Sequence, residues 1–256
     1  MSSARVRVEI TAGVGTLTLE RPPVNVLDRP MLDELRVTLL DLARRPDLRV
    51  LVLTGAGKAF CAGVDVADHT ADRINDALPA FHAAIGALLA IDVPVIAAIN
   101  GAALGGGCEL AIACDIVLAR SDARIGLPET RLGVFPPVAA ALLPRMIGWQ
   151  RAAECVLTGR TWTAEEAQDL GLVRRVVAPA SFEAEVRAQA EHFAVLSGPV
   201  LRVAKRALRD GASAEAMHGV ERAEALYLDT LMQLPDANEG IAAFLEHRPP
   251  VWSDAP

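Results

Sequence analysis

The chain has 256 residues, enough to bury a large core as one domain or as one domain with a smaller appendage. Its composition, 52% hydrophobic and 22% charged, is that of an ordinary globular protein and excludes a disordered one. The formal net charge of −7 gives no long-range attraction to nucleic acid or to an anionic membrane surface, so we expect neither partner.

Several features of the sequence bear on the compartment. The amino-terminal residues turn at once into a strand-like alternation, so we predict no signal peptide. The apolar segment 93–104 is broken by Pro94, Asn100 and Gly101, and is shorter than the roughly 20 residues that span a bilayer. The cysteines form no C-x-x-C pair and sit in apolar surroundings, as reduced core thiols do. We therefore predict a cytoplasmic protein without a membrane span.

The first half of the chain alternates predicted strands with predicted helices. Alternating or continuous apolar patterns predict strands at 5–10, 14–20, 49–55, 93–100, 116–120 and 123–127. Helical spacing of apolar residues predicts helices at 31–45 and 74–91. Ala12-Gly13 separates the first two strands and indicates a hairpin. This order of elements predicts an α/β fold.

Beyond about residue 137 the strand pattern nearly vanishes, apart from residues 171–178. Pro136 and Pro137 can open a helix in its first turn. Thr163 and Glu166 have the spacing of a capping box, which predicts a helix that ends at Gly171.

The last part of the chain, from Ser181 to about His247, is helical in pattern, with breaks near Gly198, Gly211 and Pro235. Its residues are rich in Ala and Leu, which favours packing or oligomerisation rather than catalysis. We therefore divide the chain into a core at 1–195 and a helical C-terminal region at 196–256.

Residues 101–115, GAALGGGCELAIACD, place three glycines directly before a carboxylate and an apolar segment. We expect a glycine turn between a strand that ends at Asn100 and a helix that opens near Gly107. No P-loop order, dinucleotide fingerprint or G-x-S-x-G motif occurs in the chain. The first amides of a helix lack intrahelical partners and glycine lets a ligand approach them, so the pattern favours an oxyanion hole beside Glu109. The alternative is that the glycines only permit close packing and that Glu109 is a solvated first-turn acid.

Two other turns carry similar features. Residues 58–66, KAFCAGVDV, follow a buried strand and place Ala62-Gly63 in an apolar turn, which gives a second source of exposed amides. Residues 123–136 present Glu129 in a third turn. The sequence spacing of the two glutamates does not by itself show that they meet. No histidines occur at metal-ligand spacing, so we expect no metal site.

These motifs, in this order, resemble the enoyl-CoA hydratase/isomerase (crotonase) family over nearly the whole chain. The segments that carry the resemblance are 14–28, 57–66, 93–116, 123–136, 156–177 and 244–252. The resemblance implies a crotonase-like spiral of β-β-α units, with a helical C-terminal region that serves trimerisation. It also implies assembly as a homotrimer or as a hexamer of two trimers.

The resemblance assigns roles to four residues. The amides of Val64 and Gly106 form the oxyanion hole, which would bind the thioester carbonyl oxygen of an acyl-CoA. Glu109 and Glu129 match the paired glutamates of the hydratases, where one takes a proton from water as it attacks Cβ and the other supplies a proton to Cα. Two close carboxylates in an apolar pocket are kept in different protonation states by repulsion and desolvation. No metal or redox cofactor is implied, and CoA is part of the substrate.

For the CoA portion we name Lys58, Ala62, Asp65 and Arg248 as candidates. Lys58 and Arg248 carry the charge that phosphates require, although exposed cations on such loops are commonly only solvated. Asp65 is also explained as a residue that holds its turn by side-chain-to-backbone hydrogen bonds.

The segment after Glu129 departs from the family pattern. Where hydratases carry glycines and a polar residue, this chain has Pro137 and the alanines 139–141. Proline has no backbone N–H, so we expect a water-orienting amide in this loop to be missing or moved. The bulkier, drier wall resembles that of hydratases acting on cyclic dienoyl-CoA thioesters, and simple repacking around ordinary chemistry is the alternative.

We therefore predict an enoyl-CoA hydratase that adds water to the 2,3 double bond of an unsaturated acyl-CoA. One alternative is a double-bond isomerase in which Glu129 alone moves the proton. A second is a hydratase of a cyclic dienoyl-CoA, and a third is a catalytically silent binding protein on the same fold.

Overall fold

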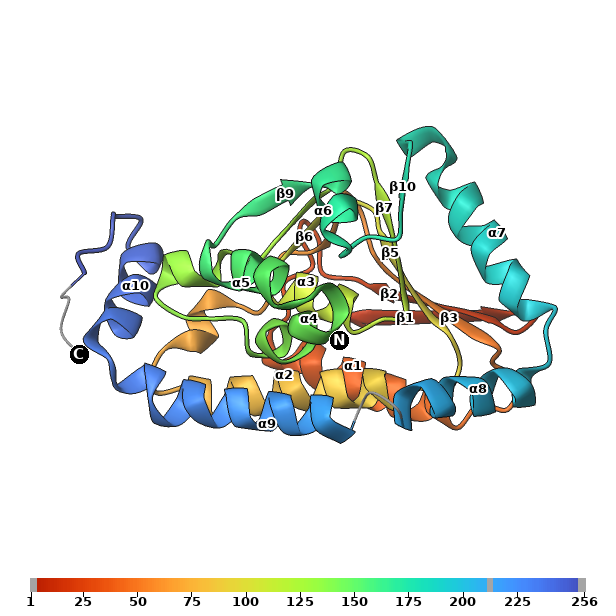
Figure 1. Ribbon diagram of the computed structural model, residues 1–256, viewed down its shortest axis with the longest axis horizontal. Coiled ribbons are helices and arrows are strands. Elements are labelled where there is room, and N and C mark those ends of the chain that lie inside the picture. The colour runs from red at the N-terminus through yellow and green to blue at the C-terminus, as the bar shows by residue number, and fades with distance from the viewer. Residues whose placement is uncertain (1–3, 211–213, 253–256) are drawn as a thin grey trace.

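Two β-sheets of different size organise the fold of the chain (Figure 1), seen in a computed structural model that describes residues 4–210 and 214–252. The larger sheet has the strand order β1-β2-β3-β5-β7-β10 and the smaller has the order β4-β6-β8-β9. The strands of the larger sheet are β1 (Val6–Thr11), β2 (Val14–Leu19), β3 (Val50–Gly55), β5 (Val95–Ile99), β7 (Ile116–Arg120) and β10 (Arg175–Val177). Those of the smaller sheet are β4 (Ala59–Cys61), β6 (Ala102–Leu104), β8 (Arg124–Gly126) and β9 (Thr161–Thr163).

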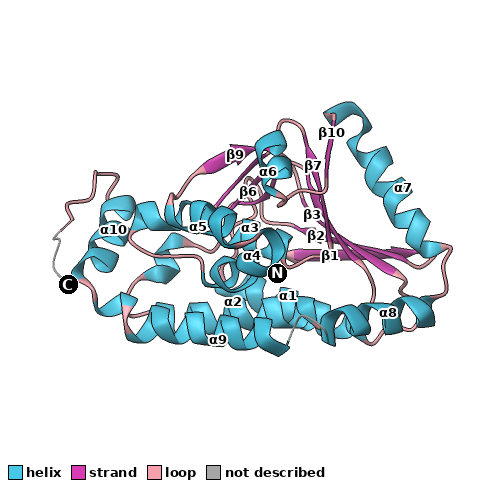
Figure 2. Ribbon diagram, in the orientation of Figure 1, coloured by secondary structure: helices cyan, strands magenta, loops and turns pink. Residues whose placement is uncertain are grey.

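Helices pack around these sheets (Figure 2). They are α1 (Arg29–Ala43), α2 (Ile74–Leu89), α3 (Gly106–Ile112), α4 (Pro137–Ile147), α5 (Trp149–Leu157), α6 (Ala164–Leu170), α7 (Phe182–Ala194), α8 (Gly198–Asp210), α9 (Ala214–Asp229) and α10 (Pro235–Leu245). Short 3-10 turns are η1 (Val66–His69), η2 (Pro128–Leu132), η3 (Pro179–Ser181) and η4 (Leu231–Gln233). Within the described residues, no helix combines the length and the apolar character needed to cross a bilayer.

The order of strands repeats along the chain. A strand of the larger sheet is followed by a short strand of the smaller sheet and then by helical structure, as in β3-β4-α2 and β5-β6-α3. β7 and β8 lead in the same way to η2 and α4. This repeat confirms the predicted α/β spiral of β-β-α units.

Local patterns explain the elements that the sequence predicted. β1 and β2 pair antiparallel around Ala12 and Gly13, whose φ angles of 50° and 84° are those of a tight hairpin turn. The capping box of Thr163 and Glu166 is present, and α6 ends at Gly171 in the left-handed conformation. All these predictions are confirmed.

Three short strands were not predicted. β4 lies in the segment 58–66, for which we expected only a turn. β6 lies in the segment that we expected to be a glycine turn, and β9 lies in a region that showed no strand pattern. Each has only three residues, too few for an alternating pattern, and is held by pairing with its neighbours in the smaller sheet.

The C-terminal helices cover the core of the same chain. α7 packs Phe182 and Ala190 against Val50 and Ile96 of the larger sheet. α8 and α9 run along the side of the molecule where α1 and α2 lie (Figure 1), and α9 contacts both α2 and α4. The predicted breaks near Gly198 and Pro235 coincide with the first residues of α8 and α10, while the break near Gly211 lies outside the described residues. The division of the chain near residue 195 stays a prediction.

Candidate active site

Three turns with predicted functional residues begin at one edge of the smaller sheet. β4, β6 and β8 are parallel neighbours, so their carboxyl ends meet at this edge. Val64 lies after β4, Gly106 directly after β6, and Glu129 after β8. Pairing of the short strands therefore brings together segments that are far apart in sequence, at the kind of strand-end crevice where parallel sheets commonly bind ligands.

The turns that carry Val64 and Gly106 are in direct contact. A Cβ atom added to Gly106 would lie 3.0 Å from Val64 Cγ2 and 3.3 Å from the Val64 nitrogen. Leu27 fixes the peptide groups on either side of Val64. Its N–H donates a hydrogen bond to the Gly63 carbonyl oxygen, and its carbonyl oxygen accepts one from the Asp65 N–H. Among the described residues, neither the Val64 nor the Gly106 amide donates a hydrogen bond to the protein. Two neighbouring N–H groups are thus available to one acceptor.

Glycine is required at two positions of these turns. Gly63 and Gly105 have φ angles of 101° and 54°, which other L-residues rarely adopt. A Cβ atom at Gly63 would lie 2.9 Å from the Leu104 carbonyl oxygen, and one at Gly105 would lie 2.9 Å from Glu129 Oε1. The glycines therefore permit close approach between the turns and to the Glu129 carboxylate.

Glu109 is buried in the first turn of α3, with 3% of its surface exposed. Its Oε1 atom accepts a hydrogen bond of 2.9 Å from the Ala139 amide. Burial raises the pKa of Glu109 to about 7, and the Ala139 and Val138 amides oppose this rise because they stabilise the carboxylate. The interpretation of Glu109 as a solvated first-turn acid is therefore wrong.

The donors to Glu109 come from the first turn of α4. Pro136 and Pro137 begin this helix as predicted, and neither has an N–H group. The next free amides, which have no partner within the helix, face Glu109. In this chain, amides of the loop that departs from the family pattern thus bind the carboxylate of Glu109.

Glu129 lies in η2, close to Glu109. Its pKa is raised well above the ordinary value, first by burial and then by repulsion from the negative charge of Glu109. Its Oε2 atom is buried without a hydrogen-bond partner among the described residues. The structure therefore brings the two glutamates together, and the Ala139 and Val138 amides stabilise the anion of Glu109.

Tyr227 on α9 was not among the predicted site residues. Its ring is buried, with 1% exposed, and lies 5.4 Å from the ring of Phe135, in the loop after Glu129. Burial and the charges of Glu129 and Glu109 all raise the pKa of its phenol. Val220 and Tyr227, two turns apart, lie on one buried face of α9, and this helical spacing is a sequence signal that was not used for the chain's single tyrosine.

Two of the candidate CoA-binding residues lie near the Val64 turn. Lys58 is exposed just before β4 and forms no ion pair with a described residue. Ala62 is partly buried, and its amide donates to the Val24 carbonyl oxygen at 2.9 Å. Binding of CoA by either residue stays a prediction.

The other two candidates have partners within the chain. Asp65 caps η1 by accepting a hydrogen bond of 3.1 Å from the Ala67 amide, the turn-holding role considered from the sequence. Arg248 forms ion pairs of 2.6 Å with Glu239 and with Glu246. Their contribution to CoA binding also stays a prediction.

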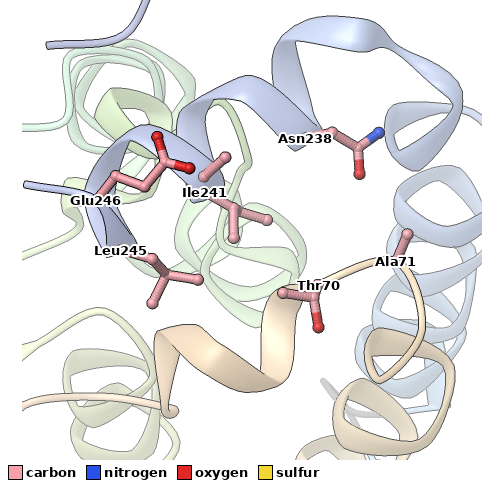
Figure 3. A pocket seen from close by; sticks show the side chains of 7 residues that line it. Thr70, Ala71, Asn238, Ile241, Leu245 and Glu246 are labelled. Carbon is pink, nitrogen blue, oxygen red and sulfur yellow. The ribbon is translucent and has the colours of Figure 1, made fainter. Parts of the chain in front are cut away.

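A cavity of about 220 Å³ lies between the turn after η1 and α10 (Figure 3). Its lining residues are Thr70, Ala71, Asn238, Ile241, Ala242, Leu245 and Glu246. Ile241 also belongs to the apolar cluster that contains Tyr227, but neither glutamate lines this cavity. In the described part of the chain, His, Cys, Asp and Glu side chains form no cluster of three or more able to hold a metal ion.

Comparison with known proteins agrees with this geometry. The model of the enoyl-CoA hydratase/isomerase family matches residues 9–255. The chain is 38% identical to a probable enoyl-CoA hydratase of Mycobacterium bovis over 99% of both chains, and 36% identical to the cyclohexa-1,5-dienecarbonyl-CoA hydratase of Thauera aromatica over 99% of this chain and 98% of that one.

A solved structure supports the same assignment. The crystal structure of an enoyl-CoA hydratase from Mycobacterium avium subsp. paratuberculosis superposes with a TM-score of 0.88 at 29% identity, covering 98% of this chain and 99% of that one. The chain therefore belongs to the enoyl-CoA hydratase/isomerase family. The predictions of the family, the fold class and a hydro-lyase acting on enoyl-CoA are confirmed.

Proposed function

We propose that the chain hydrates the 2,3 double bond of an unsaturated acyl-CoA through Glu109 and Glu129, with the Val64 and Gly106 amides as an oxyanion hole. One observation carries the proposal: two buried carboxyl groups, both with raised pKa values, lie beside two adjacent turns whose amides are free. General acid-base chemistry requires such a pair, because one group must accept a proton while the other supplies one.

The proposed reaction begins with the thioester carbonyl oxygen bound by the two amides. A water molecule gives a proton to the Glu109 carboxylate as its oxygen attacks Cβ, and the electrons of the double bond move to the carbonyl oxygen. The amides stabilise this enolate. The Glu129 carboxyl group then protonates Cα to give the 3-hydroxyacyl-CoA. Transfer of the extra proton from Glu109 to Glu129 restores the starting state.

The environments of the glutamates decide which is the base. The α4 amides stabilise the charged form of Glu109, whereas the charge of Glu109 opposes ionisation of Glu129. Glu109 is therefore the base in the hydration direction and Glu129 the acid. The chemistry needs no metal or redox cofactor, because the thioester itself carries the electron sink.

The remaining predictions stay part of the proposal. We propose that Lys58, Ala62, Asp65 and Arg248 contact the CoA portion, and that the chain assembles as a homotrimer or hexamer. We also propose a cytoplasmic location, which the free, buried cysteines favour because reduced thiols are typical of that compartment.

A cyclic dienoyl-CoA is the second candidate substrate. The rings of Phe135 and Tyr227 form an aromatic wall next to the glutamates, in the loop that departs from the family pattern. The similarity to the Thauera aromatica hydratase, whose name specifies a cyclohexadiene thioester, favours the same substrate class.

A double-bond isomerase requires only Glu129 as a proton carrier. Burial of Glu109, with its carboxylate bonded to the Ala139 amide of α4, favours hydration instead.

The test is hydration of crotonyl-CoA, longer enoyl-CoAs and a cyclic dienoyl-CoA, followed by ultraviolet absorbance of the conjugated thioester. Glu109→Gln and Glu129→Gln should each abolish hydration. Isomerisation that survives in Glu109→Gln would instead support the isomerase. Binding of acyl-CoA without turnover, unaffected by both substitutions, would support the silent binding protein.

A further inference from the structure

Four buried side-chain polar atoms have no hydrogen-bond partner among the described residues, and two of them lie at the glutamate pair. These two are Glu129 Oε2 and the hydroxyl oxygen of Tyr227. A buried hydroxyl without a partner destabilises a protein, so its presence beside reacting groups indicates that it binds something there. The other two atoms are Oδ1 of Asn100, which can only accept a hydrogen bond, and Nε2 of His82, whose other ring nitrogen bonds Glu224.

Packing also places Tyr227 beside the loop that follows Glu129, independently of its electrostatics. α9 packs on α4, and a Cβ atom at Gly219 would lie 3.2 Å from Ala141 Cβ, so the two helices approach closely. Two turns further along α9, the Tyr227 ring meets Phe135, which follows Glu129 in the chain. Tyr227 therefore lies on the helix that packs against α4, with its ring against the loop that follows Glu129.

The attacking water needs a hydrogen-bond donor that the loop does not supply. One lone pair of the water oxygen attacks Cβ, and the other must accept a hydrogen bond if the water is to be held in position. Pro136 and Pro137 have no N–H, and the Ala139 amide already donates to Glu109. Tyr227 is neutral at physiological pH, so its O–H is available as this donor.

We propose that the Tyr227 hydroxyl donates a hydrogen bond to the oxygen atom that is added to Cβ, as water in one direction and as the 3-hydroxyl group in the other. This inference rests on the proposed hydration. It assigns to the C-terminal helical region a catalytic residue in addition to its packing role. The hydroxyl binds and orients the water while the two glutamates transfer the protons.

The test compares Tyr227→Phe with the wild type in the hydration of crotonyl-CoA. Removal of the hydroxyl alone should lower kcat about 10- to 100-fold, because a misplaced water attacks poorly, and should leave KM nearly unchanged. The melting temperature should stay equal or rise, since the variant buries no unpartnered hydroxyl. A structural role would predict the opposite change in melting temperature.

Glu224→Gln, one turn earlier on α9, serves as the control. It should weaken the contact with His82 while kcat stays within about twofold of the wild-type value.

A second readout does not depend on turnover. Because Tyr227 is the chain's only tyrosine, incorporation of 3-fluorotyrosine gives a single fluorine resonance. This resonance should shift more on addition of 3-hydroxybutyryl-CoA than on addition of butyryl-CoA, which lacks the 3-hydroxyl group. This arm also decides the question if Tyr227→Phe does not fold.

The outcomes separate the two proposals. A wild type that hydrates enoyl-CoA, with an unchanged kcat in Tyr227→Phe, would overturn the role of Tyr227 and leave the proposed function intact. Equal fluorine shifts with both thioesters would overturn that role as well. A wild type that hydrates no member of the substrate panel would overturn both.

Discussion

Two helices begin at the active site, and their first amides are used differently. At α3, the Gly106 amide has no partner within the described chain and lies beside the free amide of Val64. At α4, the amide of Ala139 is bound to the carboxylate of Glu109. Helix N-termini offer unpaired N–H groups in both cases. The comparison teaches that the neighbouring side chain decides whether such groups stay free for a ligand or stabilise a buried carboxylate.

The difference has a chemical consequence. An occupied α4 terminus lowers the free energy of the Glu109 anion, and that anion in turn raises the pKa of Glu129. In the proposed mechanism, the free amides at Val64 and Gly106 bind the negative charge that develops on the substrate. The same backbone feature would then support the base at one helix and the enolate at the other.

The largest expected effect comes from removing either member of the glutamate pair. Glu109→Gln and Glu129→Gln each abolish one proton transfer, so kcat for crotonyl-CoA hydration should fall about 10²- to 10⁴-fold in an ultraviolet assay. Glu183→Gln, an exposed position on α7, is the matched control and should leave kcat unchanged. Full activity in either active-site variant would contradict the two-carboxylate mechanism.

A smaller loss should follow from blocking the free amides at α3. A Cβ atom in Gly106→Ala would lie 3.0 Å from Val64 Cγ2 and 3.3 Å from the Phe81 ring, which narrows access to the Gly106 and Val64 amides. We expect kcat/KM to fall about 10²-fold with little change in melting temperature. In the control, Gly198→Ala, the added atom meets Arg49 at an ordinary 3.6 Å, so steady-state rates should match the wild type.

Removing the donor at α4 should have a more moderate effect. Ala139→Pro deletes the N–H that binds Glu109 in the first helical turn, where proline is tolerated better than further inside the helix. The pKa of Glu109 should rise, because its anion loses a donor. The acid limb of the kcat/KM profile should therefore move to higher pH, with about a tenfold loss of activity near pH 7. An unmoved limb in a folded variant would show that α4 does not tune Glu109.

The same pKa predicts the pH dependence of stability. The pKa of Glu109 is about 7 in the folded protein against an ordinary value of 4.5, so the folded state binds the proton more tightly. Its contribution to stability is therefore complete below about pH 4.5 and is lost as the pH rises through 7. Glu109→Gln removes this loss and should raise the free energy of unfolding by up to about 3 kcal/mol at alkaline pH, and by less in acid. Melting curves between pH 5 and 8 test this, and a gain that grows toward low pH would refute it.

Local patterns in the sequence predicted most of the fold. The hairpin at Ala12-Gly13, the capping box at Thr163 and the helix start at Pro137 depend on neighbouring residues only, so short segments are sufficient to predict them. β4, β6 and β9 have three residues each and depend on their partner strands, and for this reason no local pattern revealed them.

The site was predictable in its parts and not in its assembly. The glycine turns and both glutamates stood out in the sequence, but parallel pairing of β6 with β8 is what brings Glu129 to Glu109. The contact between Ala139 and Glu109 requires the tertiary position of α4. Tyr227 lies about 100 residues further along the chain, in a region whose Ala- and Leu-rich pattern indicated packing, and only the approach of α9 to α4 places it at the site.

The most direct test of this account is the infrared absorbance of the protonated carboxyl group at about pH 8, where exposed carboxyl groups are ionised. The account predicts a carboxylic acid band in the wild type that disappears in Glu129→Gln, because Glu129 keeps its proton while Glu109 is ionised. A wild-type spectrum without such a band would show that both glutamates are charged, and would contradict the division of base and acid between them.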